Sequence, residues 1–141
     1  MIEIINQQNR YRINPDTFHN LLEKLINFYK VKNPEVTLAF INNAPMKRLN
    51  EKYLNKNTST DVLSFPLNEK GADGKFYLGD IIISAPYAFM QSKSKEHGFE
   101  RELEILTVHG FLHLLGFEHF KGMEEEEQKI HKLLFKVSHG H

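Results

Sequence analysis

Three histidines lie within the segment HGFLHLLGFEH, which spans 109–119, although the whole chain of 141 residues contains only eight. His109 and His113 are four residues apart, and on a helix this spacing places two side chains on one face, one turn apart. Two imidazole nitrogens in that arrangement can bind the same metal ion. The rest of the segment is mostly apolar, and ring nitrogens buried there need a partner. The spacing therefore indicates a metal site.

Gly116 stands where this helix is expected to end, because glycine readily adopts the left-handed conformation that terminates helices. The chain can then reverse and bring His119 toward the first two histidines. Three neutral imidazoles leave one position of a tetrahedral ion open for water, which is typical of catalytic zinc. The chain has no cysteine, so thiolate ligands are excluded. We expect one Zn2+ ion per chain, held by His109, His113 and His119, although nickel, copper and iron also bind such sites.

A simpler interpretation is that each histidine is a hydrogen-bonded packing residue. It suits a single histidine or a pair, but three at this spacing with a glycine at the turn are hard to explain without a metal. The five remaining histidines lack this geometry and are expected at the surface: His19, His97, His131, His139 and His141.

The histidine pattern resembles the metzincin protease motif, with one departure. Those enzymes place the general-base glutamate directly after the first histidine, where this chain has Gly110. Glycine cannot accept a proton, so peptide hydrolysis by that route is disfavoured. Glu118 is the local candidate for the missing base, and the alternative is that it only adjoins His119 as an exposed acid. His109 and Glu118 are thus the catalytic candidates.

Apolar periodicity predicts the elements that must position these side chains. Strands are expected at Ile2 and Ile4, with Tyr11 and Ile13 as further candidates, and then at 36–41, 61–66 and 77–84. One helix is expected to begin at 14–16. Four others are expected to cover 46–55, 85–96, 100–115 and 123–137. The chain is therefore expected to be a single α+β domain over 1–141, with a small sheet covered by helices.

Several details of these elements are also predicted. Pro66 should end its strand, and 68–75 should form an exposed loop. The isoleucines at 81–83 imply a strand buried on both faces. The helix at 100–115 is apolar on nearly all sides, which marks it as central. The four glutamates at 124–127 are expected to form a solvated helix start, where acids suit the helix dipole.

Composition limits the function classes. Eighteen basic and eighteen acidic residues give a net charge of zero, so bulk charge does not favour nucleic-acid binding. The first residues, MIEIINQQNR, lack the basic start and long apolar run of a signal peptide. No apolar stretch approaches the roughly 20 residues of a membrane span. A cytoplasmic protein without membrane attachment is expected.

The segment HGFLHLLGFEH resembles the HGxLHLxGxDH signature of the YbeY family, bacterial metal-dependent endoribonucleases that act in ribosomal RNA maturation. Upstream, LNEKYLNKNTSTDVLSFP (49–66) is similar to that family's LNxxYRxKDxPTDVLSFP, and GDIIIS (79–84) to its GDIxIS. Met123 and Glu127 fit its M-x-x-x-E spacing. These blocks follow in the family's order across most of the chain.

The resemblance implies a mixed sheet of about four strands, covered by about five helices, with a metzincin-like zinc site formed by His109, His113 and His119. It also implies a single-strand-specific endoribonuclease that processes the 3′ end of 16S ribosomal RNA and acts in ribosome quality control. The implied partners are ribosomal RNA and the small ribosomal subunit, reached directly or through a protein partner. No DNA partner is expected.

Two departures from the family pattern concern the substrate. The family's arginine after the tyrosine, implicated there in RNA cleavage or binding, is matched here by Leu54, and a leucine cannot bind phosphate. The family's following Lys-Asp is Lys-Asn here. Basic side chains at i, i+4 and i+8 could instead follow an RNA backbone, although surface helices commonly carry lysines. The substrate-binding candidates are Arg48, Lys52, Lys56, Thr60, Asp61 and Ser64.

Two alternative functions remain open. The first keeps the zinc and changes the substrate, as in a zinc-dependent peptidase or amide hydrolase, against which Gly110 counts. The second is a non-catalytic ribosome-assembly factor whose metal site stabilises the fold, which the loss of the arginine at Leu54 keeps open. Because the chain is neutral, we expect the isolated protein to bind RNA weakly.

Overall fold

Four strands form one mixed sheet in the computed structural model, which describes residues 1–54, 60–118 and 122–135. The sheet order is β1-β2-β4-β3: β1 (Ile2–Asn6), β2 (Pro34–Ile41) and β4 (Phe76–Ser84) run parallel, and β3 (Val62–Lys70) pairs antiparallel with β4 at the edge. The helices are α1 (Pro15–Phe28), α2 (Asn43–Leu54), α3 (Ala85–Ser92), α4 (Phe99–Leu114) and α5 (Met123–Leu134). These elements confirm the expected α+β domain with a four-stranded mixed sheet and five helices.

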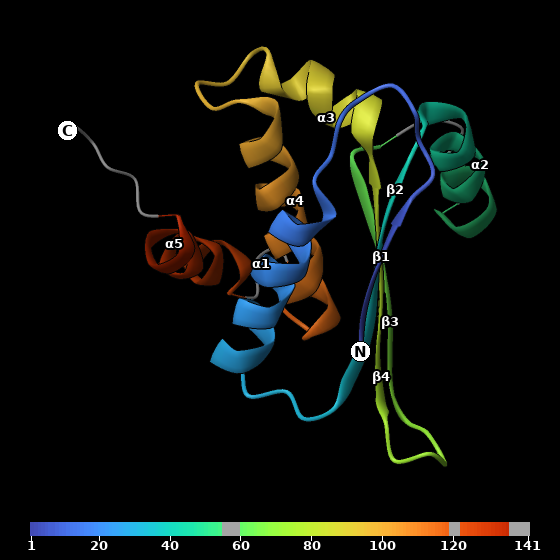
Figure 1. Cartoon of the computed structure of the whole chain (residues 1–141), viewed down its shortest axis with the longest axis vertical. Helices are drawn as coiled ribbons and strands as arrows, with labels where there is room; N and C mark the ends of the chain where they lie inside the picture. Colours follow the sequence, from blue (N-terminus) through green and yellow to red (C-terminus); the bar gives the residue numbers. More distant parts are fainter. Residues whose placement is uncertain (55–59, 119–121, 136–141) are drawn as a thin grey trace.

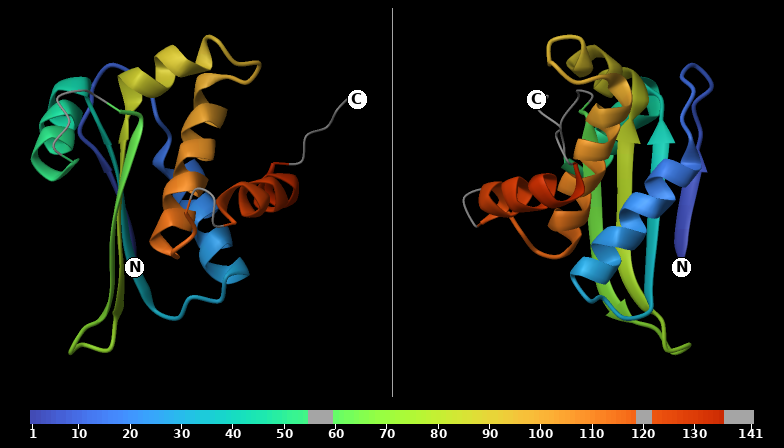
Figure 2. Two further views of the ribbon diagram at one scale, coloured as in Figure 1. Left: turned by 180° about the vertical axis from the view of Figure 1, so that it is seen from behind. Right: turned by 60° about the vertical axis from the view of Figure 1, so that its left-hand side comes forward.

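Helices cover the two faces of the sheet unequally (Figures 1 and 2). α1 and α4 pack on one face, α3 crosses the end of the sheet beside α4, and α5 packs on α4. α2 lies on the opposite face. Ile81 and Ile83 belong to the larger core, whereas Ile82 packs with Met46 and Leu63 in the smaller core under α2. β4 is thus buried on the face toward α4, whereas Ile82 on the other face is only partly buried, so the expected burial on both faces holds only in part.

α4 is the central helix of the larger layer. It contacts α1, α3, α5, β3 and β4, as its apolar character on nearly all sides predicts. Leu103, Val108, Phe111 and Leu112 are at most 1% exposed. A helix held on so many sides is a rigid support for the side chains that it presents at the surface.

Helix starts follow the capping signals in the sequence. The side chain of Asn14 accepts a hydrogen bond from the backbone N–H of Asp16 at 3.0 Å, and Pro15 occupies the first position of α1, where no N–H is needed. α2 begins at Asn43 rather than at residue 46. Pro45 then lies within its first turn, whose backbone N–H groups have no partner inside the helix.

β3 departs from the expectation at Pro66. The strand does not end there but continues to Lys70, with an irregular register between Pro66 and Glu69. A proline lacks the N–H that a central strand requires, but an edge strand tolerates it. The expected loop at 68–75 therefore shortens to the turn between β3 and β4.

Two further expectations are corrected by local contacts. Tyr11 and Ile13 are not part of a strand, because the Gln8 side-chain carbonyl accepts hydrogen bonds from the backbone N–H groups of Arg10 and Tyr11 and folds this segment into a turn. α5 ends at Leu134, and residues 136–137 of the expected helix lie outside the described ranges. Among the described helices, none is long and apolar enough to cross a membrane.

Candidate metal centre

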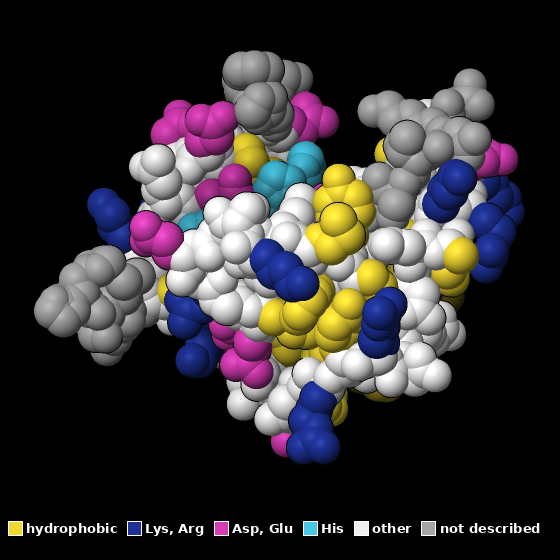
Figure 3. All heavy atoms as spheres, turned by 90° about the horizontal axis from the view of Figure 1, so that it is seen from above, with side chains coloured by type: hydrophobic (Ala, Val, Ile, Leu, Met, Phe, Trp, Pro, Cys, Tyr) yellow, Lys and Arg dark blue, Asp and Glu magenta, His cyan; other side chains and the backbone are white. Residues whose placement is uncertain are grey.

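His109 and His113 project from the same face of α4. Their ring centroids are 4.7 Å apart and the rings lie at 75° to each other. Both side chains are only partly exposed, and both line one cavity. In the space-filling view, histidine side chains reach the surface beside acidic ones (Figure 3). The structure therefore places this pair as the four-residue spacing predicts.

Glu127 of α5 is hydrogen-bonded to the first histidine, His109. Its Oε2 atom lies 2.8 Å from Nδ1 of His109. A carboxylate acceptor at Nδ1 holds the proton on that nitrogen and leaves the lone pair of Nε2 for a metal. Metal-ligating histidines commonly have such a partner on the second ring nitrogen. The pair thus fits a transition metal that accepts imidazole ligands.

The four glutamates at 124–127 are expected from the sequence to be solvated, but only some of them are. Glu124 and Glu125 are exposed, but Glu126 accepts a hydrogen bond from the Tyr29 hydroxyl and Glu127 contacts His109. Local geometry does not connect Glu127 with a histidine 18 residues earlier. The M-x-x-x-E spacing of the last helix is the signal in the sequence that points to this glutamate.

The environment shifts the pKa values of the two histidines in opposite directions. The hydrogen bond to Glu127 raises the pKa of His109 above its usual 6.5, against the effect of burial. Burial and the neighbouring His109 lower the pKa of His113. Burial raises the pKa of Glu127, but its bond to His109 and the charge of that ring outweigh burial, so the net shift is downward. The lowered pKa of His113 favours the neutral ring that a metal ligand needs.

The end of α4 has the turn that the motif predicts. Gly116 has φ = +101°, and its backbone N–H donates to the carbonyl of His113 at 3.0 Å. His119 itself lies outside the described residues. Within the described ranges, no three His, Cys, Asp or Glu side chains form a metal-ligating group. The third ligand therefore remains a prediction from the sequence.

The cavity in front of the histidines has a volume of about 260 Å³. Its described lining consists of Leu54, Val62, Leu63, Ser64, Phe65, Pro66, His109, His113 and Glu118. Glu118 is the only carboxylate in that lining. The Ser64 hydroxyl donates to the carbonyl of Gly110 at 3.2 Å, which joins β3 to α4 beside the first histidine.

Gly110 lies where α4 packs closely on the sheet. A Cβ atom at this position would lie 2.6 Å from Cγ2 of Ile81 and 3.2 Å from Oγ of Ser64. Only a residue without a side chain fits without displacing these neighbours. The position that carries the catalytic glutamate in metzincin proteases is therefore used here for helix–sheet packing.

Thr60 and Asp61 directly precede β3; Val62, which follows them, lines the histidine cavity, but they do not. The Asp61 carboxylate accepts a hydrogen bond from the backbone N–H of Val62 at 2.7 Å. After Glu127, its charge also contributes to the raised pKa of His109. When the Gln91 side-chain amide is oriented so that its nitrogen faces the two carboxylates, that nitrogen donates hydrogen bonds to Asp61 and to Glu102.

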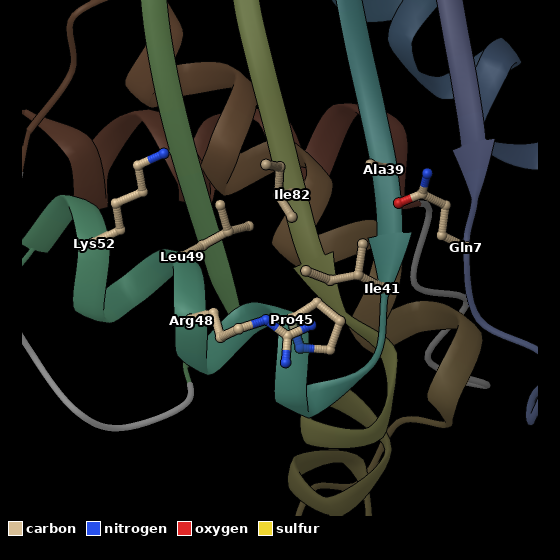
Figure 4. Close-up of a pocket in the computed structure, with 8 residues that line it drawn as sticks. All are labelled: Gln7, Ala39, Ile41, Pro45, Arg48, Leu49, Lys52 and Ile82. Carbon is tan, nitrogen blue, oxygen red and sulfur yellow. The ribbon is translucent and has the colours of Figure 1, made fainter.

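Arg48 and Lys52 do not reach the histidine cavity. They line a separate groove of about 320 Å³, between α2 and the face of the sheet that α4 does not cover (Figure 4). The floor of this groove is aliphatic and includes Ala39, Ile41 and Ile82. Lys56, the third basic candidate, lies outside the described residues.

The other histidines are less exposed than expected. His19, His97 and His131 each reach the surface with part of the side chain and are otherwise buried. Nε2 of His97 lies 2.6 Å from the buried Glu102 carboxylate. Burial lowers the pKa of His131, whose ring packs against Phe135. His139 and His141 lie outside the described residues.

Comparisons with known proteins agree with this arrangement. The family model described as Endoribonuclease YbeY matches residues 3–137. A Thermodesulfovibrio yellowstonii protein of that name is 35% identical over 150 residues, covering 96% of this chain and 94% of the relative. A Geobacillus relative of the same name is 44% identical over 124 residues, covering 79% and 78%. A solution structure from Thermotoga maritima aligns with a TM-score of 0.60 at 28% identity, covering 92% of this chain and 85% of that one. This chain therefore belongs to the Endoribonuclease YbeY family.

Proposed function

We propose that this protein is a zinc-dependent endoribonuclease that cleaves single-stranded RNA. The observation that carries the proposal is the pair His109–His113, braced by Glu127 and open to a cavity, in a chain of this family. We further propose His119 as the third ligand. A zinc ion bound there would act as a Lewis acid on a phosphoryl oxygen and would lower the pKa of a water.

The surrounding side chains have defined parts in this proposal. Glu127 fixes the ring of His109, and burial lowers the pKa of His113, which favours the unprotonated ring. Glu118, which lines the cavity, is the candidate that accepts or donates the proton. Ser64 fixes β3 against α4, so that the cavity keeps its shape when RNA enters.

The remaining substrate-binding candidates are assigned by their positions. We propose that Arg48, Lys52 and Lys56 contact phosphates of RNA that extends beyond the histidine cavity, since the first two lie in the groove under α2. Thr60 and Asp61 directly precede β3, next to a residue that lines the cavity. Because Asp61 is an acid, its proposed contact is a donor group of the RNA rather than a phosphate.

The cellular role follows from the family. We propose that the protein acts in the cytoplasm on ribosomal RNA, at the 3′ end of the 16S species, and in ribosome quality control. With a net charge of zero, it is not expected to hold RNA tightly by bulk charge. The small ribosomal subunit, or a protein bound to it, would then deliver the substrate.

The direct test combines metal analysis with RNA cleavage. Purified protein should contain about one equivalent of metal. It should cleave a single-stranded RNA but not the same sequence in a duplex. His109→Ala and His113→Ala should lose both metal and cleavage, whereas His19→Ala on α1 should retain both.

Three results would contradict the proposal. Cleavage that survives a chelator and His113→Ala would remove the metal from the mechanism. Hydrolysis of amide substrates without RNA cleavage would favour the amide hydrolase. Normal ribosomal RNA maturation in cells that carry a metal-free His113→Ala protein would favour a non-catalytic assembly factor.

A further inference from the structure

The cavity beside His109 and His113 has a wall made only of hydrocarbon. Leu54 at the end of α2 and Val62 and Pro66 on β3 form it, and these three side chains are called the hydrocarbon wall below. Alternate residues of a strand share a face, so Val62 and Pro66 face the same side as Ser64, which bonds α4. Leu54 approaches from α2 on the other side of β3, and all three wall residues line the same cavity as the histidines.

Leu54 stands out because it is an aliphatic side chain with half of its surface in solvent, at 50% exposure. Its neighbour Tyr53 packs edge-on against Phe65, with ring centroids 5.3 Å apart, and this contact anchors the end of α2 to β3. The position of Leu54 at the cavity is thus supported by packing. Its exposed half is apolar surface that a ligand can cover.

The charges of the cavity disfavour phosphate as the ligand of this wall. None of its described lining residues is Lys or Arg, and Glu118 is acidic. Among these described residues a phosphate would meet no cationic side chain, whereas the flat face of a nucleobase matches an aliphatic surface. The volume of about 260 Å³ lies below the usual range for small-molecule sites, which suits a single base.

We infer that the hydrocarbon wall is a subsite for one unstacked nucleobase, next to the phosphodiester that the histidine site acts on. The inference rests on the proposed RNA substrate and assigns Leu54 as the residue that controls how much this base contributes to binding. Bases in a duplex are stacked and paired, whereas single strands can present a base to the wall. The wall has no hydrogen-bonding group in its side chains, so it does not distinguish one base from another.

The test measures binding without cleavage. Fluorescence anisotropy of the chelator-treated full chain is recorded with a labelled single-stranded RNA and with copies that carry an abasic site at successive positions. Wild-type protein should lose roughly three- to tenfold in affinity at one abasic position, which corresponds to covering the exposed half of one leucine. Leu54→Ala should weaken binding of the intact RNA and abolish this position dependence.

Leu67→Ala is the matched control. Leu67 lies on β3 with the same 50% exposure but does not line the cavity, so its variant should behave like wild type. Leu54→Arg gives a second measurement, because a cation would contact phosphate and should raise affinity for intact and abasic RNA alike.

Several outcomes overturn the subsite: an abasic effect that persists in Leu54→Ala, equal losses in the two leucine variants, no position dependence, or no binding by wild type. The proposed endoribonuclease function fails separately. Base-dependent binding without cleavage by the metal-loaded protein would contradict that function and leave the subsite standing. Cleavage of RNA with binding that does not depend on a base would support the endoribonuclease function and contradict the subsite.

Discussion

Nδ1 of His109 and Oε2 of Glu127 lie 2.8 Å apart and join the central helix α4 to α5. The two residues are far apart in the sequence, yet the Glu127 carboxylate orients the imidazole ring of His109. The histidine side chain is 34% exposed and the carboxylate 20%, so the contact sits at the border between core and solvent. α5 therefore contributes to the candidate metal centre, although its side chains are not expected to bind the metal.

Removal of the Glu127 carboxylate should weaken metal binding. Glu127→Gln leaves the ring of His109 less firmly oriented and less basic, and comparable changes cost roughly 10- to 100-fold in metal affinity. Competition titration of zinc against a chromophoric chelator measures this. The control is Glu125→Gln, an exposed neighbour on the same helix. Unchanged affinity in Glu127→Gln would mean that the contact has no part in metal binding.

The same pair predicts a pH dependence for the metal-free protein. The pKa of His109 is raised above 6.5, so its contribution to stability is complete below about 6.5 and is lost as pH rises through the folded-state value. The pKa of Glu127 is lowered below 4.5, so its contribution is complete above about 4.5 and is lost as pH falls through the folded-state value. The stability difference between wild type and Glu127→Gln should be largest between these limits.

Two measurements check that prediction. Denaturant unfolding across this pH range gives the stability difference directly. NMR titration of the His109 ring should show its pKa falling in Glu127→Gln, because burial then acts with less opposition. A His109 pKa that does not change would contradict the assigned cause.

Gly110→Ala should destabilise the fold. Alanine favours a helix over glycine by about 1 kcal/mol, but the added Cβ would lie 2.6 Å from Ile81 in a packed core. We expect a net loss of about 1–2 kcal/mol in the free energy of unfolding. Gly98→Ala, at the start of α4, meets no atom within 4 Å and should cost less than about 1 kcal/mol. Equal stability of Gly110→Ala and wild type would contradict the packing argument.

Lys95 and His97 both contact the buried Glu102 carboxylate, so their contributions to stability should be coupled. Glu102 is 0% exposed and is contacted by Lys95 Nζ at 3.0 Å and His97 Nε2 at 2.6 Å. Either partner can compensate for loss of the other, so Lys95→Ala and His97→Ala should each cost about 1 kcal/mol. The double variant leaves the buried carboxylate without either partner and should cost about 3–5 kcal/mol. Additive losses in this double-mutant cycle would contradict the shared role.

The sequence predicts the elements around the metal centre well because their signals are local. The apolar character of α4, the four-residue histidine spacing and the left-handed Gly116 each depend on neighbours in the chain. Helix periodicity and glycine conformation act over a few residues, so they can be recognised before the fold is known.

The remaining features depend on contacts between distant segments. The basic residues Arg48 and Lys52 are regularly spaced on their helix, but only the packing of α2 decides which face of the sheet they share. The contact of Glu127 with His109 requires α5 to return to α4. Pro66 would end a central strand, and the tolerance of β3 comes from its edge position, which the sequence does not specify.

The tight contact at Gly110 also restricts what this scaffold can become. A glutamate next to the first histidine would complete the protease motif, but its Cβ alone would collide with Ile81. A new catalytic acid at that position would displace Ile81 of β4 unless that residue also changed. Selection for peptide hydrolysis would therefore begin with a loss of stability, which a compensating change in β4 would have to offset.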